Sequence, residues 1–393
     1  MSTAQTHTVA SVCRNRTAYC PILVTVQGRR AVKVSGDAVA ARVQGIVVRR
    51  GLRAVAVCYG SGNVTNPAGS AMARSWLTAL GFGLIFSAMA IDKPAAGIAL
   101  ALHGHRHAGA QAFENASTWL LAGANKVIAK SHDAPMNNPA QRLKDAAERG
   151  MKLIVIDPRR SESARRAHLH LQPVPGEDTA LLAGLIHILP AEEWVDRAFM
   201  AQHAVGLVAL REAVARFTPA WVAERAGVPV GDLLEAARCF GRAPKGCVAC
   251  ATGASFSAHA NLTFYLALCL NTRCGRWARE GDAAPYPNVL QPAVQPGAQP
   301  YPPYPVFGKV RLRAHGLRES AAGMPTAALA DDILAPGAGG IKALICVGGN
   351  PLESWPDQRK ADTELAQVSR LMRVATSAVL QMSTAAMSLE LRR

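Results

Sequence analysis

Residues 151–160 read MKLIVIDPRR, and this stretch decides the fold. Residues 152–156 form a short apolar run rich in β-branched side chains, closed by Asp157 and a proline. Such a run predicts a strand that is buried on both faces of a parallel sheet. The strand end carries one acid, Asp157, and two bases, Arg159 and Arg160. This combination suits a ligand that has hydroxyls and phosphates.

The segments around this strand predict an α/β fold. Residues 139–149 before it and 176–189 after it have helical spacing, and further apolar runs at 54–58, 119–122 and 341–347 predict strands. Alternating strands and helices are typical of doubly wound sheets, which hold ligands at the carboxyl ends of their strands. We therefore expect two interleaved doubly wound, Rossmann-like α/β domains. Two short strands at 22–27 and 31–35 predict a hairpin in a small N-terminal β unit.

Composition restricts the partners and the compartment. The chain has 393 residues, a net charge of +16 and nine cysteines. Its charges are scattered arginines without long runs, which excludes a nucleic-acid-binding tail and favours an anionic cofactor or an acidic partner subunit. The cysteine content indicates a reducing compartment. The N-terminus has no export signal, and the longest apolar stretch, 77–91, is too short to span a bilayer. We expect a cytoplasmic protein without a membrane span.

Three groups of possible metal ligands remain open. Cys13 and Cys20 precede the hairpin, and their spacing fits a metal site no better than two ordinary cysteines. Alternate histidines at 103, 105 and 107 could chelate a metal, but a solvated polar loop is favoured because no carboxylate or thiol lies nearby. Cys247 and Cys250 form a C-x-x-C pair inside an apolar strand, which favours core packing over redox or zinc chemistry.

The order of short motifs resembles the molybdopterin oxidoreductases of the dimethyl-sulfoxide-reductase and formate-dehydrogenase type. One motif alone is weak, but many in register are specific. They are an iron–sulfur-type segment at 13–24, a "GxNP"-like turn at 123–125, a "DPR" strand end at 156–160, a "PGTD"-like turn at 175–178, a "GxG…LN…TGN…G"-like segment at 252–281 and a second "GNP" at 348–351.

The resemblance implies a cofactor and the residues that would hold it. Two pterin guanine dinucleotides clamp a molybdenum or tungsten ion in that family. Asp157 would then bind nucleotide hydroxyls or the guanine edge, and the Gly-Asn turns would let the backbone approach the other arms. The residues implied in cofactor binding are Gly123, Asn125, Asp157, Arg159, Arg160, Gly176, Asp178, Gly253, Gly349 and Asn350, with Cys13 and Cys20 as metal ligands of the 4Fe-4S segment.

The resemblance also implies a division of the chain. We expect residues 1–45 to be a vestigial iron–sulfur-type segment and 98–250 to be the second α/β domain. The first α/β domain would be discontinuous, with residues 46–97 and 251–393, and a Pro-rich loop at 284–306. The family's C-terminal cofactor-binding domain is expected to be absent.

Several positions depart from the family pattern. Arg16 stands where the iron–sulfur segment has its second cysteine, and two thiolates cannot hold a cubane cluster. The metal ligand of the family should fall near 98–103, which offers only His103. Lys126 replaces a usual proline. We therefore expect little or no redox turnover from this chain.

Three functions stay open. The chain is a molybdopterin-dependent, formate dehydrogenase-like oxidoreductase, or a non-catalytic subunit that supports an electron-transfer or catalytic partner subunit, or a truncated remnant of such an enzyme. An unrelated Rossmann-like nucleotide-binding protein is disfavoured, because no G-x-G-x-x-G follows a first strand.

Overall fold

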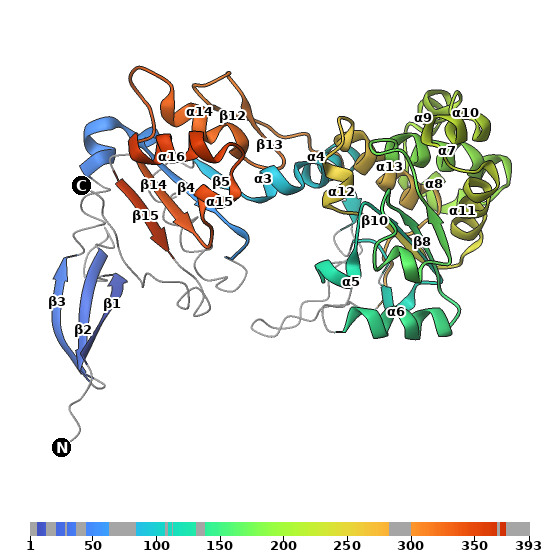
Figure 1. Cartoon of the computed structure of the whole chain (residues 1–393), viewed down its shortest axis with the longest axis horizontal. Helices are drawn as coiled ribbons and strands as arrows, with labels where there is room; N and C mark the ends of the chain where they lie inside the picture. The colour runs from blue at the N-terminus through green and yellow to red at the C-terminus, as the bar shows by residue number, and fades with distance from the viewer. Residues whose placement is uncertain are drawn as a thin grey trace. The chain divides into compact units, whose positions relative to one another are not determined.

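The computed structural model describes most of the chain as two compact units (Figure 1). Unit 1 comprises Met1–Ile91, Gly308–Glu319 and Gly323–Arg393, and unit 2 comprises Asp92–Phe307 and Ser320–Ala322. The described residues are 6–12, 21–27, 30–36, 45–62, 84–106, 109–111, 113–130, 138–282, 300–367 and 370–374.

A four-stranded parallel sheet forms the centre of unit 2. Its strands lie in the order β10-β7-β8-β9. They are β7 (Thr118–Ala122), β8 (Lys152–Ile156), β9 (Leu169–Leu171) and β10 (Gly246–Cys250). The register aligns the last residues of all four strands, because Cys250 pairs with Ala122, Ala122 with Ile156, and Ile156 with Leu171. The carboxyl ends therefore meet at one edge.

Helices cover both faces of this sheet. On one face, Leu120, Ile154 and Ile156 belong to a core shared with α7 (Asp178–Ala191), α10 (Pro219–Ala226), α11 (Val230–Arg242) and α13 (Ala260–Arg273). On the other face, Trp119 and Val155 pack against Leu143 and Ala146 of α6 (Pro139–Glu148). Side chains of a strand alternate between its two faces, so one continuous apolar run can supply both cores.

Shorter elements complete unit 2. They are α4 (Pro94–His103), β6 (His105–Arg106), η3 (Phe113–Asn115), α5 (Lys126–Ala129), η4 (Ala164–Arg166), α8 (Arg197–His203), α9 (Leu207–Val214), α12 (Thr252–Ser255) and β11 (Pro300–Tyr301), which pairs with β6. The helix α4 packs along α13, with Ala95 and Ala99 against Phe264. Small residues on α4 allow this close approach.

Unit 1 has its own four-stranded parallel sheet. Its order is β15-β14-β4-β5, with β4 (Val55–Tyr59), β5 (Ile85–Ser87), β14 (Ala343–Val347) and β15 (Arg370–Val374). One face packs against η5 (Thr326–Ala328), α14 (Leu329–Leu334), α15 (Pro351–Ser354) and α16 (Gln358–Gln367). The other face packs on Ile46, in the helical residues 45–50, which η1 (Leu52–Ala54) joins to β4.

A separate antiparallel sheet lies near the N-terminus of the chain. Its strands are β1 (Thr6–Val12), β2 (Pro21–Gln27) and β3 (Arg30–Gly36), in the order β1-β2-β3. The remaining elements, α3 (Met89–Asp92), β12 (Phe307–Arg311) and β13 (Arg318–Ser320), include residues of both units. Within the part of the chain that is described, no helix combines the length and the hydropathy needed to cross a bilayer.

The fold class expected from the sequence is confirmed, since α/β units with parallel sheets are present together with the small β unit. Some local predictions are wrong. The helical spacing of residues 362–374 predicts a helix, but residues 370–374 form β15, paired in parallel with β14. The apolar spacing of residues 192–204 predicts a helix, but the helix begins only at Arg197, after a turn in which Glu193 has a positive φ.

Candidate functional site at a sheet edge

Most of the residues that were predicted to bind the cofactor lie in turns at the carboxyl ends of the unit 2 strands. These turns follow β7, β8, β9 and β10 on the edge where the four strands end in register. Eight predicted residues come to this edge: Gly123, Asn125, Asp157, Arg159, Arg160, Gly176, Asp178 and Gly253. In a doubly wound sheet, this is the edge that holds ligands.

Two glycine turns pack directly against each other at this edge. The Gly253 N–H donates to the Gly123 carbonyl at 3.0 Å, and Gly123 has a φ of 58°. A Cβ on Gly123 would lie 2.2 Å from the Ala254 nitrogen, which is far inside van der Waals contact. Only glycine satisfies both the left-handed backbone and this close approach. The turns after β7 and β10 are thereby fixed to each other.

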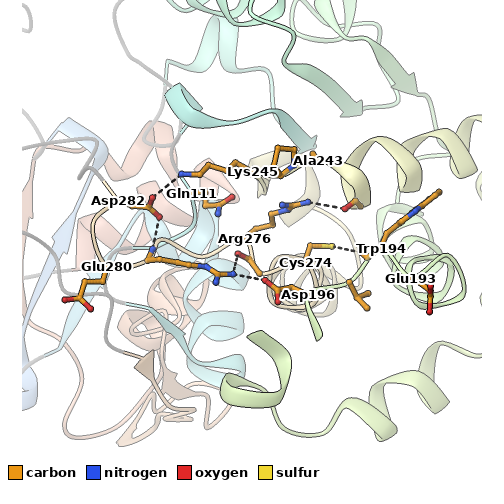
Figure 2. A pocket seen from close by; sticks show the side chains of 15 residues that line it. Gln111, Glu193, Trp194, Asp196, Ala243, Lys245, Cys274, Arg276, Glu280 and Asp282 are labelled. Atoms are coloured by element: carbon orange, nitrogen blue, oxygen red, sulfur yellow. Dashed lines mark hydrogen bonds and ion pairs between the residues drawn. The ribbon is translucent and has the colours of Figure 1, made fainter. Parts of the chain in front are cut away.

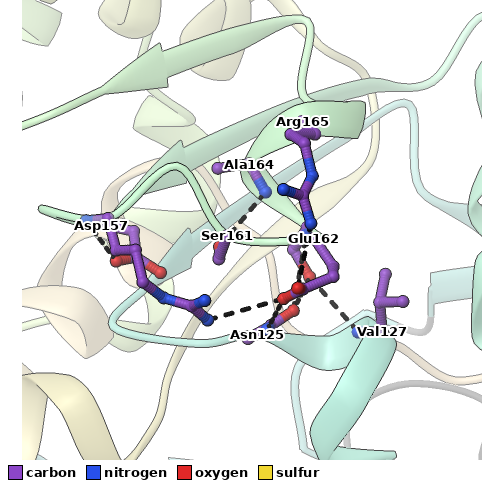
Figure 3. Close-up of polar contacts among 9 residues, drawn as sticks. Asn125, Val127, Asp157, Ser161, Glu162, Ala164 and Arg165 are labelled. Atoms are coloured by element: carbon purple, nitrogen blue, oxygen red, sulfur yellow. Dashed lines mark hydrogen bonds and ion pairs between the residues drawn. The ribbon is translucent and has the colours of Figure 1, made fainter.

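Asn125 joins the β7 turn to the loop after β8 (Figure 3). Its Nδ2 donates to Glu162 Oε2 at 2.6 Å, and its Oδ1 accepts from the Ser163 backbone N–H at 3.2 Å and from Ser163 Oγ at 3.0 Å. Arg165 forms an ion pair with Glu162 at 2.9 Å. The pKa of Glu162 is lowered by its own backbone N–H and by Asn125, so this carboxylate is held ionised.

The loop after β8 is ordered by hydrogen bonds of its own. The Asp157 carboxylate accepts from the Arg159 backbone N–H at 2.9 Å, and His170 Nε2 donates to the Asp157 carbonyl at 2.8 Å. Arg159 Nη2 lies 3.5 Å from Glu162 Oε2, which is a long contact for an ion pair. Arg159 and Arg160 are both exposed. The guanidinium groups of Arg159 and Arg160 therefore project from an ordered backbone and can bind an anion.

Asp178 is the buried acid of the site. It is 6% exposed and begins α7, a helix of 14 residues. Burial raises the pKa of its carboxyl, and the negative charges of Asp157 and Glu177 raise it further, although its own backbone N–H opposes this. The Asp157 carboxylate therefore lies close enough to Asp178 to raise its pKa. Nearby cations or hydrogen-bond donors of a ligand would relieve the repulsion.

Unit 1 has a comparable pair of turns at the ends of β4 and β14. The Gly60 N–H donates to the Val347 carbonyl at 2.9 Å, and the Gly62 N–H donates to the Gly348 carbonyl at 2.8 Å. A Cβ on Gly60 would lie 2.2 Å from Gly349 Cα. The predicted residues Gly349 and Asn350 lie in this turn, where Asn350 Oδ1 accepts from the Leu352 N–H and caps α15.

The predicted iron–sulfur ligands Cys13 and Cys20 lie outside the described residues. Seven cysteines fall inside them, and no group of three or more possible metal ligands among the described residues contains two of these cysteines. One mixed group, His168, Glu235 and Cys239, has its donor atoms within 4.8 Å of one another. It lies near the amino ends of β8 and β9, away from the turns above. Glu235 is already paired with Arg238.

His103 is enclosed, contrary to the solvated polar loop that the sequence favoured. It ends α4, its Nδ1 donates to the Gly104 carbonyl at 2.7 Å, and its Nε2 lies 3.2 Å from Thr272 Oγ1. Trp277 Nε1 in turn donates to that hydroxyl at 2.9 Å. Burial lowers the pKa of His103, so the ring is held neutral. His105 lies in β6, and His107 lies outside the described residues.

Unit 2 contains a cavity of about 640 Å³ with charged walls, and several charged side chains of these walls bind other groups of the protein (Figure 2). Arg279 pairs with Asp196 at 2.8 Å, Lys245 pairs with Asp282 at 3.2 Å, and Arg276 donates to the Phe240 carbonyl at 2.8 Å. Each of these three cations therefore has a protein partner, and the dashed lines in Figure 2 mark these contacts.

Sequence reasoning missed Glu162 and Ser163, which fix Asn125. The available signal was their position in the loop that follows Asp157. It also missed that Thr252 Oγ1 donates to Asp92 Oδ1 at 2.7 Å. No local sequence pattern predicts this bond, because the two residues are 160 positions apart.

Comparison with known proteins shows what the chain is related to. The family model for molybdopterin oxidoreductase matches residues 37–375. The F420-dependent formate dehydrogenase subunit alpha of Methanocaldococcus jannaschii is 26% identical over 250 residues, which are 59% of this chain and 35% of that protein. Formate dehydrogenase H of Escherichia coli is 35% identical over 104 residues, which are 26% of this chain and 14% of that protein.

A solved structure shares the fold. Acetylene hydratase from Pelobacter acetylenicus superposes with a TM-score of 0.65 at 16% sequence identity, covering 93% of this chain and 60% of that one. The chain thus matches about a third or less of the two formate dehydrogenases. Because the family model covers far more than half of the sequence, the chain belongs to the molybdopterin oxidoreductase family.

Proposed function

We propose that the carboxyl edge of the unit 2 sheet binds one guanine dinucleotide arm of a molybdopterin cofactor. The observation that carries the proposal is the gathering of Asp157, Arg159, Arg160 and Asp178 on turns that end one parallel sheet in register. Asp157 would accept hydrogen bonds from the guanine edge or from ribose hydroxyls. The exposed arginines would bind the diphosphate, because planar guanidinium groups match phosphate oxygens.

The residues at this edge fit such a nucleotide. The N-terminus of α7 supplies the positive end of a helix dipole. Gly176, just before it, has a φ of 97°, and a Cβ there would meet nothing within 4 Å, so the approach to the helix is open. The Gly349–Asn350 turn is proposed, within unit 1 by itself, as a further contact for a pterin nucleotide. When bound, the cofactor supplies the redox-active molybdenum or tungsten centre.

The proposed activity is that of a formate dehydrogenase-like oxidoreductase with a partner subunit, in the cytoplasm. The two proteins compared above by sequence are named formate dehydrogenases, and one is named as a subunit alpha. Substrate oxidation needs an electron acceptor, which a second subunit could provide. A 4Fe-4S cluster is not part of this proposal, since the chain offers Cys13 and Cys20 but an arginine at position 16.

A non-catalytic subunit is the alternative that one observation favours. His103 is the one side chain within 98–103 that could ligate a metal, and both of its ring nitrogens are engaged by Gly104 and Thr272. A chain that binds the pterin without a protein ligand to the metal would support a catalytic partner. Low turnover of the purified chain with bound pterin would favour this alternative.

Pterin and metal content tests the proposal directly. The full chain is purified from a host that makes molybdopterin, and the oxidised pterin fluorescence, GMP released by acid hydrolysis, molybdenum, tungsten and iron are measured per chain. We expect pterin and GMP at near-stoichiometric amounts. Asp157→Ala should lower both, whereas Asp232→Ala, a change at the start of α11, should not. Absence of GMP from the unmutated chain would refute nucleotide binding.

A further inference from the structure

Unit 2 contains a second, larger cavity that the proposed cofactor site does not use. Its volume is about 980 Å³, which is at the upper end of the range for small-molecule sites, ~300–1,000 Å³. Its walls come from the end of α4, from α8, α9 and α13, and from residues 300–303. Apolar side chains make up much of the wall, among them Phe199, Leu210, Val214, Phe217 and Leu266.

The charged groups that line this cavity all carry one sign. These groups are Arg106 and Arg273, and the described lining residues include no aspartate or glutamate. The 640 Å³ cavity is different, because Asp196 and Asp282 pair with its cations. A wall with guanidinium groups and no carboxylate attracts anions.

Arg273 is the group that needs a partner. It is only 6% exposed, and its Nε and Nη1 have no hydrogen-bond acceptor among the described residues. Burial lowers the pKa of its guanidinium, yet arginine stays protonated in proteins. An uncompensated buried charge is costly. Arg276, the other buried arginine in the described residues, also has an Nε without an acceptor among them, but its Nη2 donates to the Phe240 carbonyl at 2.8 Å.

We propose that this cavity binds a monocarboxylate with an apolar body, whose carboxylate pairs with Arg273 and whose body lies along Phe199, Leu210 and Phe217. Arg273 lines the cavity, so a carboxylate bound there can accept a hydrogen bond from its guanidinium and can compensate its buried charge. The apolar walls then bury the rest of the ligand, at a gain of about 25 cal/mol per Å² of apolar surface. The inference stands apart from the proposed function, since it uses none of the residues at the sheet edge.

Binding to the purified full chain tests the proposal, with octanoate and 3-phenylpropanoate as the probes and 1-octanol as the neutral analogue. Titration calorimetry should give saturable binding of at least one acid and at least tenfold weaker binding of 1-octanol. The better acid tells an aliphatic ligand from an aromatic one. Equal affinity for octanoate and 1-octanol, or no binding of either acid, would overturn the proposal.

The variant Arg273→Met tests the anchoring group. It should lose at least tenfold in carboxylate affinity and leave 1-octanol binding unchanged. Because it removes an unpaired buried charge, it should melt no lower than the parent in the absence of ligand. Arg149→Met is the matched control, since Arg149 is exposed and lies at the end of α6 on the other face of the sheet. Unchanged octanoate affinity in Arg273→Met would rule out this anchor.

A second measurement keeps the location testable if Arg273→Met does not fold. Trp277 lines the cavity, and its Nε1 donates to Thr272 within the same wall. A bromine atom quenches tryptophan fluorescence only at close range, so 8-bromooctanoate should quench the parent chain and quench Trp277→Phe much less. Equal quenching in both proteins would place the ligand elsewhere and refute the proposal.

Discussion

The carbonyl oxygen of Gly123 accepts a hydrogen bond from the Gly253 N–H at 3.0 Å, across two turns that are 130 residues apart in the chain. This bond holds the ends of β7 and β10 together at the proposed nucleotide site. Gly123→Ala should therefore strongly destabilise unit 2. A left-handed backbone costs a residue with a Cβ about 1–2 kcal/mol, and the collision with Ala254 adds about 1–3 kcal/mol. Denaturant unfolding measures the loss.

Gly176→Ala is the control for this change. Its φ of 97° is also positive, but a Cβ there meets nothing within 4 Å. Its free energy of unfolding should fall only by the cost of the left-handed backbone, about 1–2 kcal/mol. Equal losses in the two variants would show that the contact between the turns contributes nothing to stability.

A second prediction concerns Asn125 and Glu162. The pKa of Glu162 is lowered by its own backbone N–H and by Asn125, so its interactions stabilise the fold above the unfolded carboxyl pKa and are lost as the pH falls through the folded one. Asn125→Ala should lower the melting temperature at pH 7, and the difference from the parent should shrink in acid. Melting temperatures at several pH values between neutrality and the acid limit measure this.

Asn125→Asp has the same size as the parent residue and reverses the interaction. It places a second carboxylate where Nδ2 now donates to Glu162 at 2.6 Å. At pH 7 the melting temperature should fall further in Asn125→Asp than in Asn125→Ala. The difference should shrink in acid, because the carboxylates become protonated. A pH-independent loss in both variants would show that the Asn125–Glu162 bond is not the cause.

Asp178 gives a pH dependence of the opposite sign. Burial, then Asp157 and Glu177, raise its folded pKa above the unfolded value. The folded state then binds more protons than the unfolded one, so stability falls as the pH rises from the unfolded pKa through the folded one. Asp178→Asn should raise the melting temperature of the cofactor-free chain at pH 7 and have little effect at low pH. The same variant should lower pterin content, if Asp178 positions the nucleotide.

Asp232→Asn is the comparison for Asp178→Asn. Asp232 also lies in the first turn of a helix, α11, but it is not buried. It should show no gain in melting temperature at pH 7. A gain of the same size in both variants would assign the effect to net charge and not to burial.

The sequence predicted local elements well where one pattern determined them. The run at 152–156 is strand β8, and the C-x-x-C of Cys247 and Cys250 lies in β10, as core packing required. Residues 370–374 were predicted as helix because the helical pattern before them gives no stop signal. Parallel pairing with β14 made them a strand, and this partner lies about thirty residues away in the chain.

The site could be predicted only in part, for a related reason. A strand end with an acid and two arginines is visible at 157–160, and the resemblance supplied the other turns. Which turns touch is a tertiary fact, so the Gly123–Gly253 contact was not foreseen. The large cavity was not foreseen either, because Arg273, Phe199 and residues 300–303 belong to separate segments. How the predicted residues act on a cofactor stays a prediction.

The last prediction concerns the buried hydroxyl pair between α7 and α13. Thr179 Oγ1 lies 2.7 Å from Thr263 Oγ1, and Thr263 Oγ1 also donates to the His259 carbonyl at 3.3 Å. Thr263 uses its single hydroxyl proton for His259, so Thr179 must be the donor within the pair. Thr263→Val then leaves the Thr179 hydroxyl, in a residue only 8% exposed, without its acceptor, whereas Thr179→Val leaves Thr263 bonded to His259.

The two valine variants should therefore differ, although each removes one hydroxyl at constant shape. Thr263→Val should lower the free energy of unfolding by about 1–3 kcal/mol, and Thr179→Val by about 0.5–1.5 kcal/mol. The double variant should cost less than the sum, because it leaves no orphaned hydroxyl. Urea unfolding of the three proteins measures these values. Equal losses of stability in the single variants, or strict additivity in the double variant, would show that Thr179 does not donate to Thr263.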